Sequence, residues 1–470
     1  MTDVHSQAAG SARAAQAAQA PVDHRVLAEQ YLWMPYSGPG AQGAIRDTMR
    51  VMTHGDGVRS WDADGNEYLD GTSALEALIL GHGDAGIVEA IAAQARTLSF
   101  VDVFRFVTPA QAELAAELVA ASPGMAMAHL TPGGAEADEV AIKMARQYHA
   151  LRGDPYRMKV ITRQGAFHGV TAGAMALDGQ YFASRNVVYD GGVSWGRTVP
   201  EGACPRCDFG KASRHLACVH AIEATIRAEG PETVAAVVVD PCATAIAVSV
   251  PPVGYLRDLR AVCDRYGVLL VVDEIITGIG RTGRLFATEW DGIIPDFLTL
   301  SKALSSGYVP IGATLIAPHI RDTFLAHDAV FRHGHTYAGH PVAAAAALAV
   351  LRRVTQERLW ERAAVLGDRL LAGLRSLSGQ HRIVWDVRGK GLLTGLEIVR
   401  DNGTGEDFPD AIAAGNRLRI AARERGLTTL LLHPGNVLFI APAVIATEAD
   451  IDRMVEIMDG ALGDVEATLD

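Results

Sequence analysis

The residues of this sequence with the clearest chemical potential are an aspartate and a lysine that each follow a short apolar segment. Asp273 directly follows Val268–Val272, and Lys302 comes shortly after Phe297–Leu300. Both segments predict buried strands, and ligands of open α/β sheets bind at the carboxyl ends of the strands. Pyridoxal phosphate requires such a pair, with the lysine for a covalent link and the carboxylate for the pyridine nitrogen. Taken separately, the two residues also have ordinary explanations, Lys302 as a surface lysine and Asp273 as a helix cap.

Two further segments are consistent with a phosphate-bearing planar cofactor. Thr131–Ala137 is a turn rich in small residues before a predicted helix, and the N–H groups at a helix N-terminus bind phosphate. Ala166–Gly169 contains Phe167, whose ring would pack on one face of the cofactor. Ile275, just after the acidic strand, would pack on the other face. The alternatives are an ordinary glycine-rich turn and a phenylalanine of the core.

Four stretches together resemble the class III aminotransferases, pyridoxal-phosphate enzymes of the fold type I group. The stretches are Asp64–Asp70 with Gly81–Gly83, Gly133–Ala137, Asp273–Gly283, and Lys302 followed by His335–Pro341. Their order and spacing cover about residues 30–460. The resemblance implies an α/β fold, with a mostly parallel sheet in a large domain and a smaller α+β domain formed by the N- and C-terminal segments.

The resemblance also implies roles for individual residues. Lys302 is expected to be the Schiff-base lysine and general acid and base, and Asp273 the partner of the pyridine nitrogen. Thr336 is expected to reach the phosphate in the neighbouring subunit, which implies a homodimer or higher homo-oligomer with shared active sites. The other expected cofactor contacts are the backbone of Gly134 and Ala135 at the phosphate, Phe167 and Ile275 on the ring, and His168 beside the ring.

The implied reaction is a ping-pong transfer of an amino group from a primary amine to a 2-oxo acid such as pyruvate, through Lys302. A decarboxylase, racemase or aminomutase on the same fold is the alternative. A catalytically silent binding protein is the rival from a different class, and the complete set of Lys302, Asp273 and Thr336 argues against it.

Two departures from the family pattern bear on the substrate. Phe439 and Leu432 stand where relatives often carry an arginine, the usual partner of a carboxylate, so we expect carboxylate recognition elsewhere. Glu76 stands where relatives carry a bulky aromatic at the substrate entrance. A carboxylate there would attract a cation, as in a polyamine, amino sugar or amino polyol; an exposed glutamate at a helix start is the alternative. Trp33 and Tyr36 stand where relatives line the pocket, although both also fit packing roles.

Short apolar segments alternate with helical patterns between about residues 125 and 320, which predicts βαβ units and a mostly parallel sheet. Residues 1–22 are expected to be a disordered arm, and they contain no apolar block like that of a signal peptide. The expected organisation beyond the arm is an N-terminal segment of the small domain at 23–75, the large cofactor-binding domain at 76–345, and the C-terminal small domain at 346–470.

The composition excludes several classes of protein. The 470 residues are 49% hydrophobic and carry a net charge of −12, which argues against a disordered chain and against a general nucleic-acid binder. Apolar stretches of about 18 residues are absent from the sequence, so we expect no membrane helix. Five cysteines are too few for a disulfide scaffold and indicate a reducing cytoplasm. Their spacing with a histidine is compatible with zinc, but similar cysteines occur in the family without metal, and we expect none at Cys204, Cys207, Cys218 and His220.

Overall fold

The computed structural model describes residues 23–37, 49–177, 195–200, 217–245, 247–432 and 435–469. The expected disordered arm at 1–22 lies outside these residues, as do Cys204 and Cys207 of the cysteine motif. The chain divides into two compact units. One unit consists of Met1–His54 with Ser60–Glu67, and the other of Gly55–Arg59 with Tyr68–Asp470.

The first unit contains helix α1 (His24–Tyr31) and most of strands β1 (Met52–Asp56) and β2 (Arg59–Asp62). Asp23 caps α1, because its carboxylate accepts hydrogen bonds from the first backbone N–H groups of the helix. The turn after β2 is held by Asp62, whose Oδ1 accepts from the backbone N–H groups of Asp64 and Asn66 at 3.0 and 2.9 Å.

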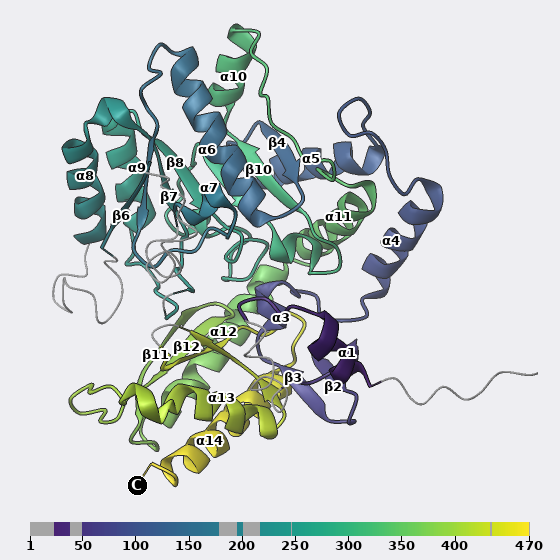
Figure 1. Ribbon diagram of the computed structural model, residues 1–470, viewed down its shortest axis with the longest axis vertical. Coiled ribbons are helices and arrows are strands. Elements are labelled where there is room, and N and C mark those ends of the chain that lie inside the picture. Colours follow the sequence, from purple (N-terminus) through teal and green to yellow (C-terminus); the bar gives the residue numbers. More distant parts are fainter. Residues whose placement is uncertain are drawn as a thin grey trace, which may run out of the picture. The chain divides into compact units, whose positions relative to one another are not determined.

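The second unit is built on a seven-stranded sheet of order β4-β10-β9-β8-β7-β5-β6 (Figure 1). β10 is antiparallel to both of its neighbours, and the other pairs are parallel, which confirms the expected mostly parallel sheet. β6 is not predicted from the sequence, because its four residues contain no continuous apolar run. The strands are β4 (Met127–Thr131), β5 (Lys159–Arg163), β6 (Gly196–Val199), β7 (Val234–Val239), β8 (Leu269–Asp273), β9 (Phe297–Leu300) and β10 (Gly312–Ile316).

Several connections between these strands contain helices with one apolar face. In α9 (Tyr255–Tyr266), Tyr255, Leu259 and Val262 are buried at helical spacing, and the helix ends at Gly267 in the left-handed region, with φ of 61°. Every residue of β7 and β8 is buried, as expected for central strands covered on both faces. The helices around this sheet are α4 (Ala85–Thr97), α5 (Pro109–Ala121), α6 (Gly134–Leu151), α7 (Ala172–Met175), α8 (Ala217–Glu229), α9, α10 (Pro318–Ala326) and α11 (Pro341–Gln356).

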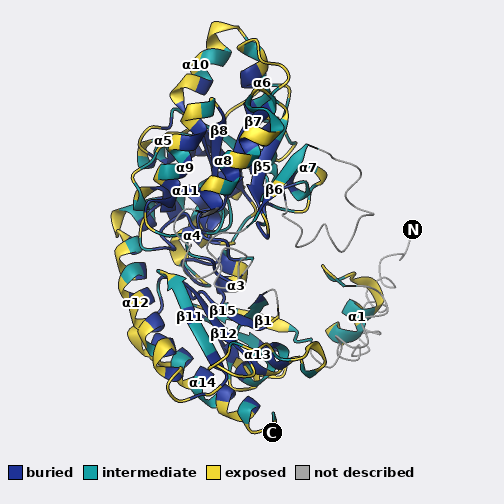
Figure 2. Cartoon of the chain, turned by 90° about the vertical axis from the view of Figure 1, so that its left-hand side faces the viewer, coloured by how far each residue is buried: buried dark blue, intermediate teal, exposed yellow. Residues whose placement is uncertain are grey.

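The C-terminal part of the second unit forms a smaller sheet of order β11-β12-β15-β14. Leu427 in β13 pairs in parallel with Leu69 in β3, so the end of the N-terminal segment lies beside C-terminal residues. Helices α12 and α14 each have a buried and an exposed face (Figure 2). The elements are α3 (Ser73–Glu76), β3 (Glu67–Asp70), α12 (Leu359–Leu377), β11 (Val384–Lys390), β12 (Leu393–Ile398), α13 (Ala414–Glu424), β13 (Leu427–Thr428), β14 (Leu430–Leu432), β15 (Val437–Ile440) and α14 (Glu448–Glu466).

None of the helices in the described ranges combines the length and the apolar character needed to span a bilayer.

Candidate active site

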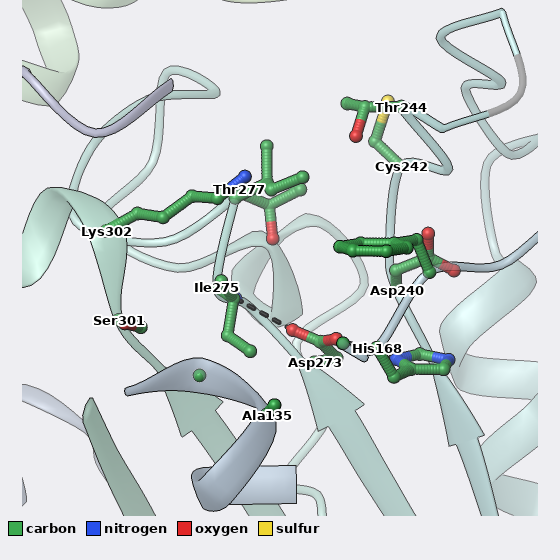
Figure 3. A pocket seen from close by; sticks show the side chains of 14 residues that line it. Ala135, His168, Asp240, Cys242, Thr244, Asp273, Ile275, Thr277, Ser301 and Lys302 are labelled. Atoms are coloured by element: carbon green, nitrogen blue, oxygen red, sulfur yellow. Dashed lines mark hydrogen bonds and ion pairs between the residues drawn. The ribbon is translucent and has the colours of Figure 1, made fainter. Parts of the chain in front are cut away.

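A cavity of about 180 Å³ lies at the carboxyl ends of β5, β7, β8 and β9 (Figure 3). It brings together seven residues that the sequence points to: Gly134, Ala135, Phe167, His168, Asp273, Ile275 and Lys302. Seven further residues line it: Gly169, Asp240, Cys242, Thr244, Ile276, Thr277 and Ser301. Asp240, Cys242 and Thr244 follow β7 directly, so the rule that ligands bind at strand ends would have found them as well.

Asp273 is the last residue of β8, and both of its carboxylate oxygens are engaged. Oδ1 accepts a hydrogen bond from the backbone N–H of Ile275 at 2.9 Å, and Oδ2 lies 2.7 Å from Nδ1 of His168. Burial, the largest single influence on the histidine, lowers its pKa. The hydrogen bond to Asp273 and the charges of Asp273, Asp138 and Asp240 outweigh burial and raise the pKa of His168 to about 9. His168 is therefore cationic near neutral pH, and its ring donates a hydrogen bond to the Asp273 carboxylate.

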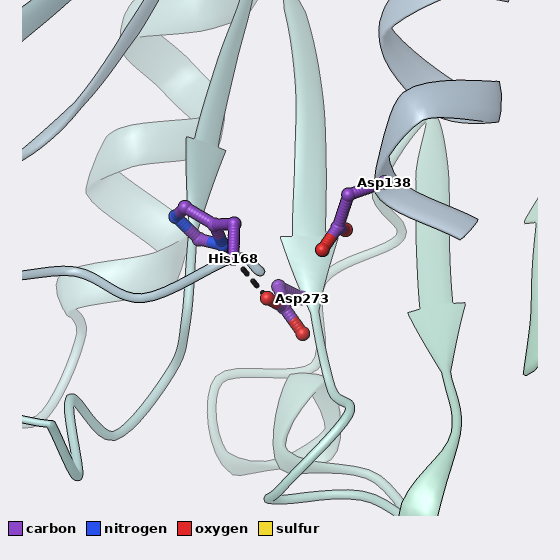
Figure 4. Close-up of side chains that lie close together, drawn as sticks. All are labelled: Asp138, His168 and Asp273. Carbon is purple, nitrogen blue, oxygen red and sulfur yellow. Dashed lines mark hydrogen bonds and ion pairs between the residues drawn. The ribbon is translucent and has the colours of Figure 1, made fainter. Parts of the chain in front are cut away.

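Asp138 is a buried acid next to this pair that the sequence analysis does not single out. It lies on α6, one turn after Gly134 (Figure 4). Its Oδ1 accepts a hydrogen bond from the Thr299 hydroxyl at 2.8 Å. Asp138 is fully buried. The signal in the sequence is an aspartate on the helix face that otherwise carries apolar residues, such as Ala141 and Ala145.

The N-terminus of α6 faces the cavity without a side-chain cap. Gly133 occupies the N-cap position and makes no side-chain hydrogen bond to the first turn, so N–H groups such as those of Gly134 and Ala135 are open to a ligand. A Cβ at Gly134 would come 2.8 Å from Cδ1 of Ile275, so a larger residue here would displace the side chain expected to pack on the cofactor ring. A helix N-terminus open in this way is suited to a phosphate.

Lys302 begins the 3₁₀ turn after β9, and its amine pairs with an acid far away in the sequence. Nζ of Lys302 lies 2.6 Å from Oε2 of Glu76. Glu76 is only 5% exposed, so the alternative of a solvent-exposed glutamate is wrong. Both residues have a left-handed backbone, with φ of 43° for Lys302 and 60° for Glu76. Such strain in residues other than glycine is typical of functional sites.

Four successive residues, Ser73 to Glu76, lie in this left-handed region, and neighbouring polar groups hold them there. The buried guanidinium of Arg281 donates to the Glu76 carbonyl at 3.0 Å and to the Ser73 hydroxyl at 3.1 Å. Oδ2 of Asp70 accepts from the N–H of Ala74 at 2.9 Å. Because left-handed geometry costs roughly 1 kcal/mol or more per residue, these contacts fix the turn that presents Glu76 to Lys302.

Other residues that the sequence points to lie outside the cavity wall. Thr336 is exposed. Phe439 is fully buried and packs in an apolar cluster that includes Leu432 and Cys242. Trp33 and Tyr36 belong to the first unit, where they are 67% and 74% exposed. Of the cysteine motif, the described residues are Cys218, which is buried, and His220, which is exposed, both on α8.

The residues of the cavity fit pyridoxal phosphate. An open helix N-terminus suits the phosphate, and the carboxyl group of Asp273, hydrogen-bonded to His168, suits a protonated pyridine nitrogen. A lysine amine, that of Lys302, lies in the same wall. Together with the mostly parallel sheet, these features define a fold type I enzyme that uses pyridoxal phosphate.

Comparison with known proteins gives the family. The model of the family "Aminotransferase class-III" matches residues 42–462. Taurine–pyruvate aminotransferase of Rhodobacter capsulatus is 36% identical over 88% of this chain and 91% of its own length. The solved (S)-enantioselective omega-transaminase of Thermomicrobium roseum is 37% identical, with a TM-score of 0.87 over 94% of this chain and 98% of its own. The omega transaminase of Pseudomonas jessenii, solved in complex with PMP, is 30% identical, with a TM-score of 0.88 over 95% of this chain and 99% of its own.

The chain belongs to the class III aminotransferase family, and it is a pyridoxal-phosphate-dependent transaminase.

Proposed function

We propose that this enzyme moves an amino group from a primary amine to a 2-oxo acid such as pyruvate, with Lys302 transferring the proton. The observation that carries the proposal is that Lys302 and Asp273 line one cavity, next to the open N-terminus of α6. The similarity to a taurine–pyruvate aminotransferase and to omega-transaminases supports an amine donor and pyruvate as acceptor.

The side chains of the cavity have separate tasks in this reaction. Pyridoxal phosphate, when bound, supplies an electron sink next to the carbon that bears the amino group. Nζ of Lys302 removes a proton from that carbon and returns it to a neighbouring atom. The carboxyl group of Asp273 would face the pyridine nitrogen and favour its protonated form, and the hydrogen bond to His168 holds this carboxyl group in place. The groups that would hold the cofactor are the N–H groups of Gly134 and Ala135, and the side chains of Phe167 and Ile275, which line the cavity.

The first prediction concerns the two half-reactions. The enzyme with its cofactor, mixed with an amine and no 2-oxo acid, is expected to release one carbonyl product per active site and then stop, because the amino group stays on the cofactor. Pyruvate is expected to restore the starting absorbance of the cofactor and to yield alanine. Rapid-mixing absorbance with product quantification measures both steps. Continuous turnover without pyruvate would instead indicate a decarboxylase, racemase or aminomutase.

Glu76 supports a proposal about the class of donor. Its carboxylate pairs with the amine of Lys302. A lysine bonded to the cofactor would no longer offer this ammonium group to Glu76. Asp273 is paired with His168 and Asp240 with Arg163, and neither pair involves Lys302. Of these carboxylates, Glu76 is therefore the one that would lose its lysine partner. Within the described residues, no arginine lines the cavity. We therefore propose a donor with a second cationic or hydroxyl-rich group, such as a polyamine, amino sugar or amino polyol, rather than one with an anionic tail.

The second prediction tests this donor class with Glu76→Gln. The ratio of kcat/KM for 1,5-diaminopentane to that for pentylamine is expected to fall about tenfold, equivalent to about 1.4 kcal/mol, because the carboxylate no longer attracts the second ammonium. The matched control is Glu89→Gln, which changes an exposed glutamate of α4. Both values of kcat/KM in this ratio come from the same variant, so an effect of the substitution on Lys302 itself cancels. A ratio equal to that of the wild type would disprove the donor proposal but not the transamination.

We also propose that the enzyme is a homodimer or a higher homo-oligomer with shared active sites. Thr336 is exposed and does not line the cavity of its own chain, as expected for a residue that completes a neighbouring site. Exposed apolar side chains lie close to it. Tyr337 is 62% exposed with its ring 5.7 Å from that of Phe100, and Phe104 is 68% exposed. Such a surface is typical of an interface, and a monomer in sedimentation velocity would contradict the proposal.

A cytoplasmic location is the last part of the proposal. The support is the low cysteine content, five in 470 residues, which is typical of a reducing compartment.

A further inference from the structure

Three titratable side chains are buried together behind the cavity wall. Asp138 from α6, His168 from the loop after β5 and Asp273 from the end of β8 point toward one another (Figure 4). A ligand atom of each lies within 4.8 Å of the others, and the residues are 0%, 2% and 4% exposed. Asp138 does not line the cavity, so it acts on a cofactor only through Asp273.

The charges of this cluster do not balance if both acids are ionised. His168 supplies one positive charge, and its Nδ1 is hydrogen-bonded to Oδ2 of Asp273 at 2.7 Å. Asp138 is left with one neutral donor, the Thr299 hydroxyl, on Oδ1, while its Oδ2 makes no hydrogen bond. An ionised Asp138 would be a buried negative charge that faces a second carboxylate, which is a costly arrangement.

The environment of Asp138 favours its neutral form. Burial is the largest influence, and together with the neighbouring charge of Asp273 it raises the pKa of Asp138 well above its ordinary value. The positive charge of His168 and the hydrogen bond from Thr299 act in the opposite direction but are weaker. Two carboxyl groups this close commonly share one proton.

We propose that Asp138 is a neutral carboxylic acid that donates its proton in a hydrogen bond to Asp273 and so positions the Asp273 carboxylate toward the cofactor nitrogen. The inference rests on the role of Asp273 given above. Asp138 is a positioning residue in this arrangement, because its hydroxyl acts on the cofactor only through Asp273.

The test compares Asp138→Asn with Asp138→Val. Asparagine keeps an oxygen for Thr299 and supplies an N–H donor toward Asp273, so it imitates the neutral acid, whereas valine removes both groups. We expect valine to weaken cofactor binding and slow the amine half-reaction about 30-fold, which is the effect of losing a hydrogen bond to a charged group. In the asparagine variant, the affinity for the cofactor and the rate of the amine half-reaction are expected to lie within about threefold of the wild-type values. An asparagine variant as impaired as the valine variant would overturn the proposal, because it would show that the negative charge of Asp138 is required.

A measurement on the cofactor-free protein detects the proton directly. Infrared spectra at pH 8 are expected to contain the carbonyl band of a protonated carboxylic acid, and the band should disappear in Asp138→Asn. Burial raises the pKa of Glu274 to about 7, so this second buried acid is mostly ionised at pH 8. Identical bands in the two proteins would overturn the proposal.

This readout separates the inference from the proposed function. The infrared band does not depend on transamination, so it remains if the half-reaction prediction fails. The same three side chains also have the spacing of metal ligands. Measuring the metal content of the purified enzyme tests whether they bind a metal ion. One equivalent of a divalent metal per chain would overturn the proposal, because a metal requires both carboxylates ionised and His168 neutral.

Discussion

Replacing Lys302 by alanine is expected to lower kcat for transamination at least about 10⁴-fold, with the folded enzyme still able to hold its cofactor. Lys302 lines the cavity, and in the proposed reaction its Nζ takes and returns the proton. Loss of a general acid–base group alone costs about 10²–10⁴-fold. Loss of the covalent link to the cofactor adds to this. The open N-terminus of α6 and the pair Asp273–His168 remain, so noncovalent binding of the cofactor is expected to persist.

Two measurements check this expectation. Borohydride reduction of the wild-type enzyme should add the mass of one cofactor to the peptide that contains Lys302, and no peptide of Lys302→Ala should gain it. The matched control is Lys159→Ala, because Lys159 is the first residue of β5, at the end of the strand away from the cavity. Turnover of the Lys159 variant should stay within about threefold of wild type. Labelling of another lysine, or a Lys302 variant with ordinary turnover, would show that the catalytic amine is elsewhere.

The central sheet and the two residues at its strand ends could be predicted from the sequence because one physical signal defines them both. Central parallel strands are buried on both faces, so β7 and β8 are continuous apolar runs, and the first polar residue after such a run lies at the carboxyl edge of the sheet. Asp273 follows this rule, and Lys302 lies two residues after the end of β9, at the same edge of the sheet. The edge strand β6 contains no continuous apolar run, so the sequence does not predict it.

The partners of these residues could not be predicted, because they depend on long-range packing. Glu76 and Lys302 are separated by 226 positions in the sequence, and the turn that carries Glu76 is left-handed at residues other than glycine. No local propensity favours that turn; the buried Arg281 and Asp70 hold it from outside. Asp138 is similar, since only the packing of α6 on the sheet shows that its carboxyl group lies next to Asp273.

Replacing Asp273 by asparagine is expected to lower kcat on the order of 10³-fold, about 4 kcal/mol of transition-state stabilisation, while the fold is retained. An amide has the same size and still accepts the hydrogen bond from the N–H of Ile275, but it carries no charge with which to keep the pyridine nitrogen protonated. The pKa of His168 is expected to fall from about 9, since the hydrogen bond and charge of Asp273 are the largest influences that raise it. Burial would then make this histidine neutral at pH 7.5.

A cofactor analogue separates the electrostatic role of Asp273 from a structural one. If the carboxylate serves to keep the ring nitrogen positive, an analogue methylated at that nitrogen carries the charge permanently and should recover part of the lost rate in Asp273→Asn. The matched control is Asp296→Asn, which removes a buried carboxylate that pairs with Arg260 at 2.7 Å just before β9, away from the cavity. The Asp296 variant should lose stability but keep its turnover per folded site. Equal losses of turnover in the two variants, with no recovery by the analogue, would mean that Asp273 only supports the fold.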